Sequence, residues 1–533
     1  MYLKNKIAVL LLCFAMMFNI VGCNNGAQNT NSKKDDDKNT TSSVQNDADS
    51  SENDMTFEED SDSSGNDEFS ENGDSSEDNT SSSKKPLSSV DKTDGSKQNN
   101  TPSYIYVEKE KEDDGYQTDR YIPTVEDVTK VDDESNKEIS AKEVSWDGPA
   151  GYVIVIPKGN AVAKETAELL QSYYKTSAKA ELEIVTDDTS AKEKEIVVGS
   201  TNRYKYTAKE GEFFAKVDGK KLIFGGGHDV TVKKAAQIQT RLTYKSGKAY
   251  EYSGNSDFVG KKFGYSYVWG DEFEGLSLDD KLWNQATKMA ATAEMALDNT
   301  ELTTFTKNGY LNMLALRYWD PKKAGVEYVC PWSVTTMETM SYKYGYVEIR
   351  AKMPFVRGAW ASFWTSSSGA LGPKNPADYS IEVDVFENFA SLDTIAPNVH
   401  KWYGDGRHTQ WGDEGEKYTF DSLNINDEYH IYGFEWTPEK MTMYVDDKPY
   451  FTYDLSINFD EGYAANKNKG ASDMSGFDTQ LYLIFNNHLF TSSSSYLPYD
   501  GCEIYPTDLP TEYVIDYVRL YQKNDGISQL YTK

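Results

Sequence analysis

Three carboxylates lie close together in a short segment that otherwise has the composition of a β-strand. Glu382, Asp384 and Glu387 are interleaved with isoleucine, valine and phenylalanine between Ile381 and Glu387. Carboxylates crowded so closely usually do chemistry, because each changes the pKa of its neighbours and so suits them to donate protons, accept protons or attack an electrophile. The segment is therefore the first candidate for a catalytic centre.

A regular strand would separate these acids. Side chains alternate between faces, so Glu382 and Asp384 share one face while Glu387 points to the other. A one-residue β-bulge between Asp384 and Glu387 would bring all three acids to one face. Either Val385 or Phe386 would then face the core. The two glutamates could then lean to within the roughly 5–5.5 Å that a retaining glycosidase needs between its nucleophile and its acid/base.

Taken alone, three acids on a strand also fit a solvated surface, but the surrounding motifs favour the catalytic interpretation. Five further strings occur in order around the acid segment: Trp269–Gly275, Tyr344–Pro354, Gly358–Trp364, Tyr444–Lys448 and Val514–Tyr521. This ordered set resembles glycoside hydrolase family 16, in particular its bulged branch of laminarinase-like, agarase-like and carrageenase-like enzymes. The resemblance covers residues 262–523.

The resemblance implies a retaining mechanism and a role for each acid. Glu382 would attack the anomeric carbon, and Glu387 would protonate the leaving oxygen and then deprotonate water. Asp384 would orient Glu382 and modulate the proton affinity of the pair. A laminarin-type β-1,3-glucan is the first choice of substrate for such an endo-β-glycanase, with mixed-linkage glucan or a β-galactan as alternatives. No cofactor is required for this chemistry.

A sugar-binding cleft needs flat aromatic faces and polar edges, because sugar rings stack their C–H faces and hydrogen-bond through their hydroxyls. By the same resemblance, the substrate-binding candidates are Glu348, Arg350, Trp360, Trp364, His400, Trp402 and Asn486. For each aromatic residue alone, packing in the core is the alternative. Glu348 and Arg350, on one face of a predicted strand, are expected to contact sugar hydroxyls.

The resemblance also implies a structural calcium ion where the two ends of the domain meet. The Asp516 carboxylate and backbone oxygens near Glu272 and Gly309 would bind it, and oxygen ligands of this type suit Ca²⁺. The alternative is that Asp516 pairs with a neighbouring basic side chain.

Alternating polar and apolar residues fill the region of residues 262–523, for example from Tyr346 to Met353 and from Met441 to Asp446. Many such strands separated by Gly, Asn and Asp turns predict an antiparallel sandwich. The resemblance implies a curved jelly-roll sandwich with the substrate cleft on its concave face. The predicted fold class is therefore mainly β, with an N-terminal α/β accessory domain and a disordered tether.

Residues 143–256 have the pattern of that separate α/β domain. Strands are expected at residues 152–156, 182–185, 195–198 and 221–224, and helices around residues 162–174 and 235–242. With the string Ile196–Arg203, this order resembles the small α/β domain that precedes the catalytic domains of bacterial β-hexosaminidases and α-glucuronidases, where it packs as an accessory.

The first residues have the layout of an export signal. Lys4 and Lys6 precede an apolar run from Ile7 to Phe18, which is too short to span a membrane. With Cys23 after a small residue, residues 1–22 resemble a bacterial lipoprotein signal peptide, and Cys23 would be lipidated. An ordinary signal peptide cleaved elsewhere is the alternative. Lipidation would anchor the protein to the bacterial membrane at the cell surface, outside the cytoplasm.

Residues 23–142 are predicted to be a disordered acidic tether, because Ser, Asn, Asp, Glu and Lys dominate and few aliphatic side chains are available to offset the entropy of ordering. Residues 31–140 hold 31 acids and 12 bases, a net charge of −19 out of −31 for the chain. Residues 39–83 hold 14 acids and no Lys or Arg, so self-repulsion should keep them extended. A partner-binding acidic tail is the alternative.

The remaining expectations concern partners and cysteines. The acidic balance gives no support for a nucleic-acid partner, and we expect a monomer that contacts its polysaccharide and, through the lipid, the membrane. Cys330 and Cys502 remain in the hydrolase-like region, and the sequence leaves open whether they are bridged. A non-catalytic glucan-binding lipoprotein is the alternative function, which the two retained glutamates disfavour.

Overall fold

The computed structural model describes residues 104–105, 122–123, 139–244, 248–286, 303–320, 325–331, 333–373, 379–388, 394–406, 408–411, 418–419, 428–455, 477–491, 502–504 and 508–533. The predicted signal peptide, Cys23 and almost all of the predicted tether lie outside these residues. Within the described part of the chain, no helix combines the length and the apolar character needed to cross a membrane.

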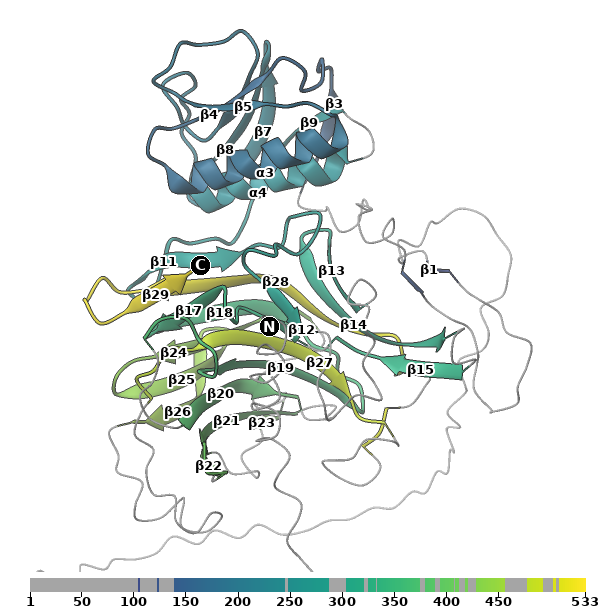
Figure 1. Cartoon of the computed structure of the whole chain (residues 1–533), viewed down its shortest axis with the longest axis vertical. Coiled ribbons are helices and arrows are strands. Elements are labelled where there is room, and N and C mark those ends of the chain that lie inside the picture. Colours follow the sequence, from purple (N-terminus) through teal and green to yellow (C-terminus); the bar gives the residue numbers. More distant parts are fainter. Residues whose placement is uncertain are drawn as a thin grey trace, which may run out of the picture. The chain divides into compact units, whose positions relative to one another are not determined.

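The described chain is mainly β, and two curved antiparallel sheets face each other in a sandwich (Figure 1). The first sheet, called here the β28 sheet, runs in the order β10 (Lys261–Lys262), β11 (Tyr265–Asp271), β28 (Thr511–Gln522), β18 (Gly345–Lys352), β24 (His430–Trp436), β25 (Lys440–Val445) and β26 (Lys448–Asp454). Beside β28 it continues through β14 (Tyr310–Asp320), which pairs with β13 (Thr304–Lys307) and β15 (Gly325–Val329). The sandwich predicted from the alternating pattern is confirmed.

The second sheet, called here the β20 sheet, holds the acid segment. Its order is β12 (Asn284–Ala286), β16 (Ser333–Thr335), β27 (Tyr482–Leu489), β19 (Ala359–Ser366), β20 (Tyr379–Glu387), β21 (Thr394–Tyr403) and β22 (His408–Trp411), with β23 (Tyr418–Thr419) paired to β21. A separate pair is formed by β17 (Met340–Lys343) and β29 (Gln529–Thr532).

The core lies between the two sheets and is built from alternate residues of each strand. Val347 and Ile349 of β18 and Ile381 and Val383 of β20 belong to one buried apolar cluster. Each such side chain contributes roughly 1.5–3 kcal/mol when it is fully buried. A slip of one residue in β20 would exchange these side chains for the acids, so burial of the apolar face fixes the register.

The predicted bulge is present in β20. Asp384 pairs with Asn398 and Glu387 pairs with Ala396, so β20 holds one residue more than β21 between these pairs. Both Val385 and Phe386 are buried in the core, whereas the sequence predicted only one of them there.

The bulge is therefore held by two apolar side chains instead of one. Its backbone is also tied to the opposite sheet, because the hydroxyl of Tyr450 in β26 donates to the carbonyl of Val385. A bulge leaves backbone groups unpaired, and this bond satisfies one of them.

The α/β part contains a mixed sheet and two helices that lie side by side (Figure 1). The strand order is β3 (Lys142–Val144), β9 (Ala249–Asn255), β7 (Glu212–Asp218), β8 (Lys221–Gly226), β6 (Glu195–Val198), β4 (Val153–Ile156) and β5 (Glu183–Thr186). The helices are α3 (Ala161–Ser177), capped by the side chain of Asn160, and α4 (Asp229–Thr243), capped by His228.

The elements expected here from the sequence all occur, and β3, β7 and β9 are additional strands. One short antiparallel pair, β1 (Tyr104–Ile105) with β2 (Ile122–Pro123), lies inside the segment predicted to be a disordered tether. β-branched and aromatic residues there favour local pairing, which the overall composition of the segment conceals.

Candidate active site

Glu382, Asp384 and Glu387 lie on the face of β20 that points away from the core. Glu382 and Asp384 are buried and Glu387 is half-buried. In the neighbouring strand β19, Ser366 lies opposite Glu382 and Ser362 lies opposite Glu387. Ser362 and Ser366 are four positions apart along β19, which is about 13 Å between Cα atoms. The side chains of Glu382 and Glu387 must therefore lean toward each other to act on one bond.

A tryptophan from a neighbouring strand donates to each glutamate. The indole Nε1 of Trp402 in β21 donates to Oε2 of Glu382 at 3.2 Å, and the indole Nε1 of Trp360 in β19 donates to Oε1 of Glu387 at 3.1 Å. Indole groups donate and never accept, so each bond favours the ionised carboxylate. Because the donors come from opposite sides of β20, they hold the two glutamates independently.

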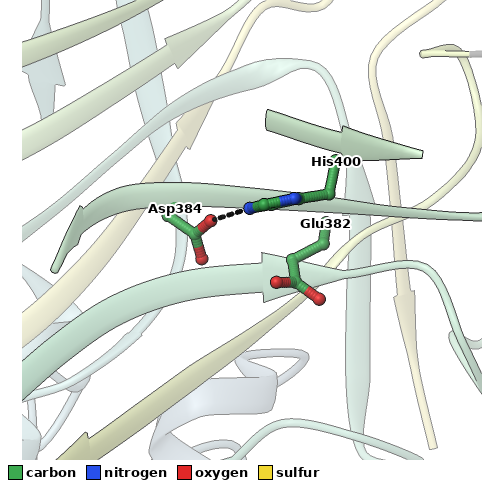
Figure 2. Close-up of side chains that lie close together, drawn as sticks. All are labelled: Glu382, Asp384 and His400. Atoms are coloured by element: carbon green, nitrogen blue, oxygen red, sulfur yellow. Dashed lines mark ion pairs between the residues drawn. The ribbon is translucent and has the colours of Figure 1, made fainter. Parts of the chain in front are cut away.

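Histidine side chains continue the polar cluster beyond Asp384. Figure 2 shows His400 with its ring nitrogen directed at the Asp384 carboxylate, and Nε2 of His400 lies 3.1 Å from Oδ2 of Asp384. The other ring nitrogen, Nδ1, lies 2.8 Å from Nε2 of His408. The His408 ring stacks on Trp402 with 3.7 Å between ring centroids. One connected set of side chains therefore joins Asp384 to Glu382.

Burial raises the pKa of all three carboxyl groups. At Glu387, burial is the main cause and the charge of Asp384 the second, and together they raise the pKa to about 8. At Glu382 the pKa is raised by burial and by Asp384, and is lowered in part by His400. Burial raises the pKa of Asp384 as well. Three such acids cannot all be ionised at neutral pH, so at least one of them keeps a proton for general acid catalysis.

Asn486 and the tryptophans of β19 form a second group beside the acids. Trp364 Nε1 donates to Oδ1 of Asn486 at 2.8 Å. Nδ2 of Asn486 donates to the carbonyl of Trp360 at 3.2 Å and to Oγ of Ser362 at 3.3 Å. The Trp360 ring stacks on Phe490 with 5.2 Å between centroids. The amide of Asn486 thus holds the indole of Trp364 and the backbone of Trp360, whose own indole donates to Glu387.

Comparison with known proteins agrees with this geometry. The family model described as Glycosyl hydrolases family 16 matches residues 303–470, which contain all three acids. Residues 303–470 are therefore similar to glycosyl hydrolases of family 16.

Three curated relatives match about half of the chain. Glucan endo-1,3-beta-glucosidase A1 of Niallia circulans is 27% identical over 49% of this chain and 38% of its own length. Beta-glucanase of Rhodothermus marinus is 26% identical over 50% of this chain and 88% of its own length. Keratan-sulfate endo-1,4-beta-galactosidase of Sphingobacterium multivorum is 26% identical over 48% of this chain and 55% of its own length. The chain therefore spans less than two thirds of the length of the first and third of these relatives.

Two predicted sugar contacts lie elsewhere in the family 16 region. Glu348 and Arg350 are in β18 of the β28 sheet, and they point away from the core on the side opposite to the acids. Glu348 is 1% exposed and pairs with Lys262, while Arg350 pairs with Asp516. The structure does not bring these two residues to the acids, because alternation within β18 places them on an outer face of the other sheet, and their contact with substrate stays a prediction that it does not support.

The one side-chain carboxylate among the predicted calcium ligands, that of Asp516, is paired with Arg350. Glu272 accepts two hydrogen bonds from Arg519, at 2.8 and 2.9 Å. Gly309 lies against the carboxylate of Glu274. A side-chain carbon at position 309 would be only 2.8 Å from Oε2 of Glu274. The carboxylates at this place are therefore engaged with basic side chains, and the backbone oxygens near Glu272 and Gly309 are the predicted ligands that remain. Calcium binding stays a prediction that these side chains do not support.

The carboxylate of Glu274 is neutralised by two basic side chains of the α/β part. Lys234 of α4 lies 2.8 Å from Oε1 of Glu274, and Arg241 of the same helix contacts the other oxygen. All three side chains are buried. Desolvation alone would raise the pKa of the Glu274 carboxyl, but the charges of Arg241 and Lys234 outweigh it and hold this pKa below its usual value.

Among the described residues, Glu382, Asp384 and His400 are close enough together to chelate a metal ion, with donor atoms within 4.8 Å of one another. We assign these atoms to hydrolysis, because the carboxylate oxygens must be free to attack and to transfer protons. Cys330 and Cys502 are both buried and are not bonded to each other.

His408 is the residue of this cluster that the sequence analysis missed. Its position could have been inferred from the turn Gly404–Gly406, which lets the chain reverse so that His408 pairs with Trp402 and lies diagonally across from His400. Two histidines eight residues apart do not have the spacing of a metal site, so their spacing alone gives no functional signal.

Proposed function

We propose that this chain is a retaining endo-β-glycanase and that β-1,3-glucan is its substrate. The observation that carries the proposal is the bulge in β20, which puts Glu382, Asp384 and Glu387 on one face with an indole donor on each glutamate. A strand without the bulge would turn Glu387 into the core, where no substrate could reach it.

The reaction would proceed in two steps, and Glu387 would give up a proton in the first step and regain one in the second. In the first step an oxygen of Glu382 bonds to the anomeric carbon, the glycosidic C–O bond breaks, and the Glu387 proton moves to the leaving oxygen. In the second step Glu387 takes a proton from water, the water oxygen bonds to the anomeric carbon, and the bond to Glu382 breaks.

The contacts of Glu382 and Glu387 indicate which glutamate is ionised and which is protonated at the start of the reaction. We place the negative charge on Glu382, because it accepts from Trp402 and lies beside His400. Burial raises the pKa of both glutamates, and we place the proton on Glu387 because its partial exposure lets it reach a substrate. Asp384 lies between them and influences both through its charge.

The choice of glucan is supported by the names of two relatives, an endo-1,3-beta-glucosidase and a beta-glucanase. The keratan-sulfate endo-1,4-beta-galactosidase supports a β-galactan as the second candidate. Reducing-end release from purified β-1,3-glucan, mixed-linkage glucan and galactan would separate these candidates. Turnover of galactan alone would overturn the glucan assignment.

Glu382→Gln and Glu387→Gln should each abolish hydrolysis, and Glu439→Gln, at an exposed turn of the β28 sheet, is the matched control. Azide should restore turnover to Glu387→Ala on a substrate with an activated leaving group, because the small anion replaces the water that needs a general base. Product released with inverted anomeric configuration, detected by NMR, would contradict the retaining mechanism.

We further propose that Cys23 carries a lipid anchor and that the acidic segment acts as a spacer. Cys23→Ala should release the protein from membranes or leave it unprocessed, with unchanged specific activity on soluble oligosaccharide. Deletion of residues 39–83 should spare soluble turnover and slow the digestion of insoluble polysaccharide, since an extended chain sets the reach of the catalytic region. Equal rates on insoluble substrate would rule out the spacer role.

A further inference from the structure

Three alternate residues at the end of β27 contact Trp360, each in a different way. His488 pairs with Trp360 and Asn486 pairs with Ser362, so their side chains share the face of the β20 sheet that carries the acids. Nδ2 of Asn486 donates to the Trp360 carbonyl at 3.2 Å. The His488 ring stands nearly perpendicular to the indole, at 85° with 5.4 Å between centroids. The Phe490 ring lies almost parallel to the indole, at 9° with 5.2 Å between centroids.

Phe490 is held in place by its own backbone and by the segments beside it. Its N–H donates to the carbonyl of Gly358 at 2.7 Å, and its carbonyl accepts from the N–H of Ile504 at 2.7 Å. Gly358 has a φ of +78°, and a side-chain carbon there would be 2.2 Å from the Ile504 nitrogen, so only glycine allows this close approach. The Phe490 side chain is buried and packs in one cluster with Cys502. Phe490 is therefore a fixed surface for the ring that stacks on it.

The orientation of the Trp360 indole matters because its N–H is bonded to Glu387. Nε1 of Trp360 lies 3.1 Å from Oε1 of Glu387. An indole N–H can only donate, so this assignment does not depend on the protonation of any other group. A hydrogen bond weakens steeply when the donor turns away from its acceptor. Trp360 is half-buried, so its ring needs a packing partner to keep the N–H aimed at Glu387.

We propose that Phe490 is a positioning residue for the acid/base, and that it holds the Trp360 indole so that the indole N–H points at Glu387. This role rests on the hydrolase function proposed above. The bond from the indole favours the ionised form of Glu387, which is the form left when its proton has moved to the leaving oxygen. Phe490 would act on the reaction only through Trp360.

The pKa of Glu387 is the measurable consequence of this arrangement. Burial and then the charge of Asp384 raise this pKa, to about 8, while His400 and the Trp360 N–H lower it in part. The titratable groups around Glu387 in the described structure come from β20, β21 and, behind the indole, β27: Glu382, Asp384, His400 and His488. Replacing Phe490 leaves all of them in the chain. Weaker donation by the indole should therefore raise the pKa of Glu387.

Indole N–H signals test the positioning role without turnover. The chain has ten tryptophans, so nitrogen-labelled tryptophan in the full-length protein gives a sparse spectrum, and Trp360→Phe identifies the signal of Trp360. In the wild type this signal should move with pH as Glu387 titrates, and it should move much less in Glu387→Gln.

The decisive variant in this experiment is Phe490→Leu. Exchange of the Trp360 indole proton with solvent should become about tenfold faster, as expected for the loss of roughly one hydrogen bond, and its movement with pH should become smaller. A Trp360 signal with the same exchange rate and the same pH dependence as in the wild type would overturn the proposal, whatever the activity of the protein.

The pH profile of kcat/KM provides the second test. Phe490→Leu keeps an apolar side chain and removes the flat ring, so Glu387 should keep its proton to higher pH. The basic limb should then move up by about one pH unit, as expected when one hydrogen bond to a charged group is weakened. Phe490→Tyr keeps a ring on the indole and should lie closer to the wild type. Phe224→Leu removes a buried ring from the core of the α/β part and should leave the limb in place.

The position of the basic limb separates positioning from packing. Loss of packing alone would lower kcat at every pH, so an unshifted limb in a folded Phe490→Leu protein would reject the role. Activity retained by Glu387→Gln would instead reject the proposed acid/base. The exchange rate of the indole proton would still decide whether Phe490 holds Trp360.

Discussion

Replacing Glu387 with glutamine should stabilise the protein at neutral pH and leave its stability unchanged in acid. Burial raises the pKa of Glu387 from 4.5 to about 8. The folded protein therefore keeps a proton that the unfolded chain releases, and folding becomes less favourable as the pH rises from 4.5 to 8. Glutamine has no proton to lose, so the variant escapes this penalty.

The size of the expected stability difference follows from the width of the pH range between 4.5 and about 8. Each pH unit inside it costs about 1.36 kcal/mol, so crossing about 2.5 units on the way to pH 7 costs at most about 3.4 kcal/mol. Glu387 is half-buried, and water screens part of this effect, so we expect a gain of about 1–3 kcal/mol for Glu387→Gln. That gain corresponds to a rise of roughly 3–10 °C in the apparent melting temperature.

Thermal unfolding of Glu387→Gln and the wild type should be compared near pH 5 and near pH 7, with Glu439→Gln as the exposed control. The difference in melting temperature should be small in acid and positive at neutral pH, and the control should show no such change. A difference that is equal at both pH values, or a variant that is less stable at neutral pH, would refute the argument from burial.

Three other predictions test the rest of the site. Glu348→Gln should leave KM unchanged, because Glu348 pairs with Lys262 in the other sheet, and a raised KM would place Glu348 in the substrate site. Tyr450→Phe should destabilise the protein by about 1–3 kcal/mol and lower kcat, since the Val385 carbonyl loses its donor; a wild-type kcat would show that the bulge needs no such support. A chelator should leave the melting temperature unchanged, and a clear fall would support the calcium ion.

The catalytic face was predictable because it depends on local geometry. The period of two along a strand shows that Glu387 needs an inserted residue to join Glu382 and Asp384, and the bulge lies where this argument places it. The same argument predicted one of Val385 and Phe386 in the core, and both are there. Packing against the opposite sheet decides how the extra residue is accommodated, and that sheet is distant in sequence.

Contacts across the sandwich were not predictable in the same way. Alternation correctly groups Glu348 with Arg350 on one face of β18, but it contains no information about which sheet β18 joins. That assignment depends on pairing with β28, more than 150 residues away in the chain. His408 was missed because its place beside His400 depends on the register of the β21–β22 hairpin, for which the turn Gly404–Gly406 was the available signal in the sequence.

The ion cluster at Glu274 limits how freely the two folded parts of the chain can be exchanged in evolution. Lys234 and Arg241 belong to α4, while the carboxylate they neutralise belongs to the hydrolase region. A different leading domain packed at this place would bury Glu274 without its cations, at a cost of several kcal/mol. Recombination that separated α4 from this acid would therefore be selected against, and substitutions at Glu274 and at the two cationic positions should occur together. The α/β part and the region that contains Glu274 would then be inherited together.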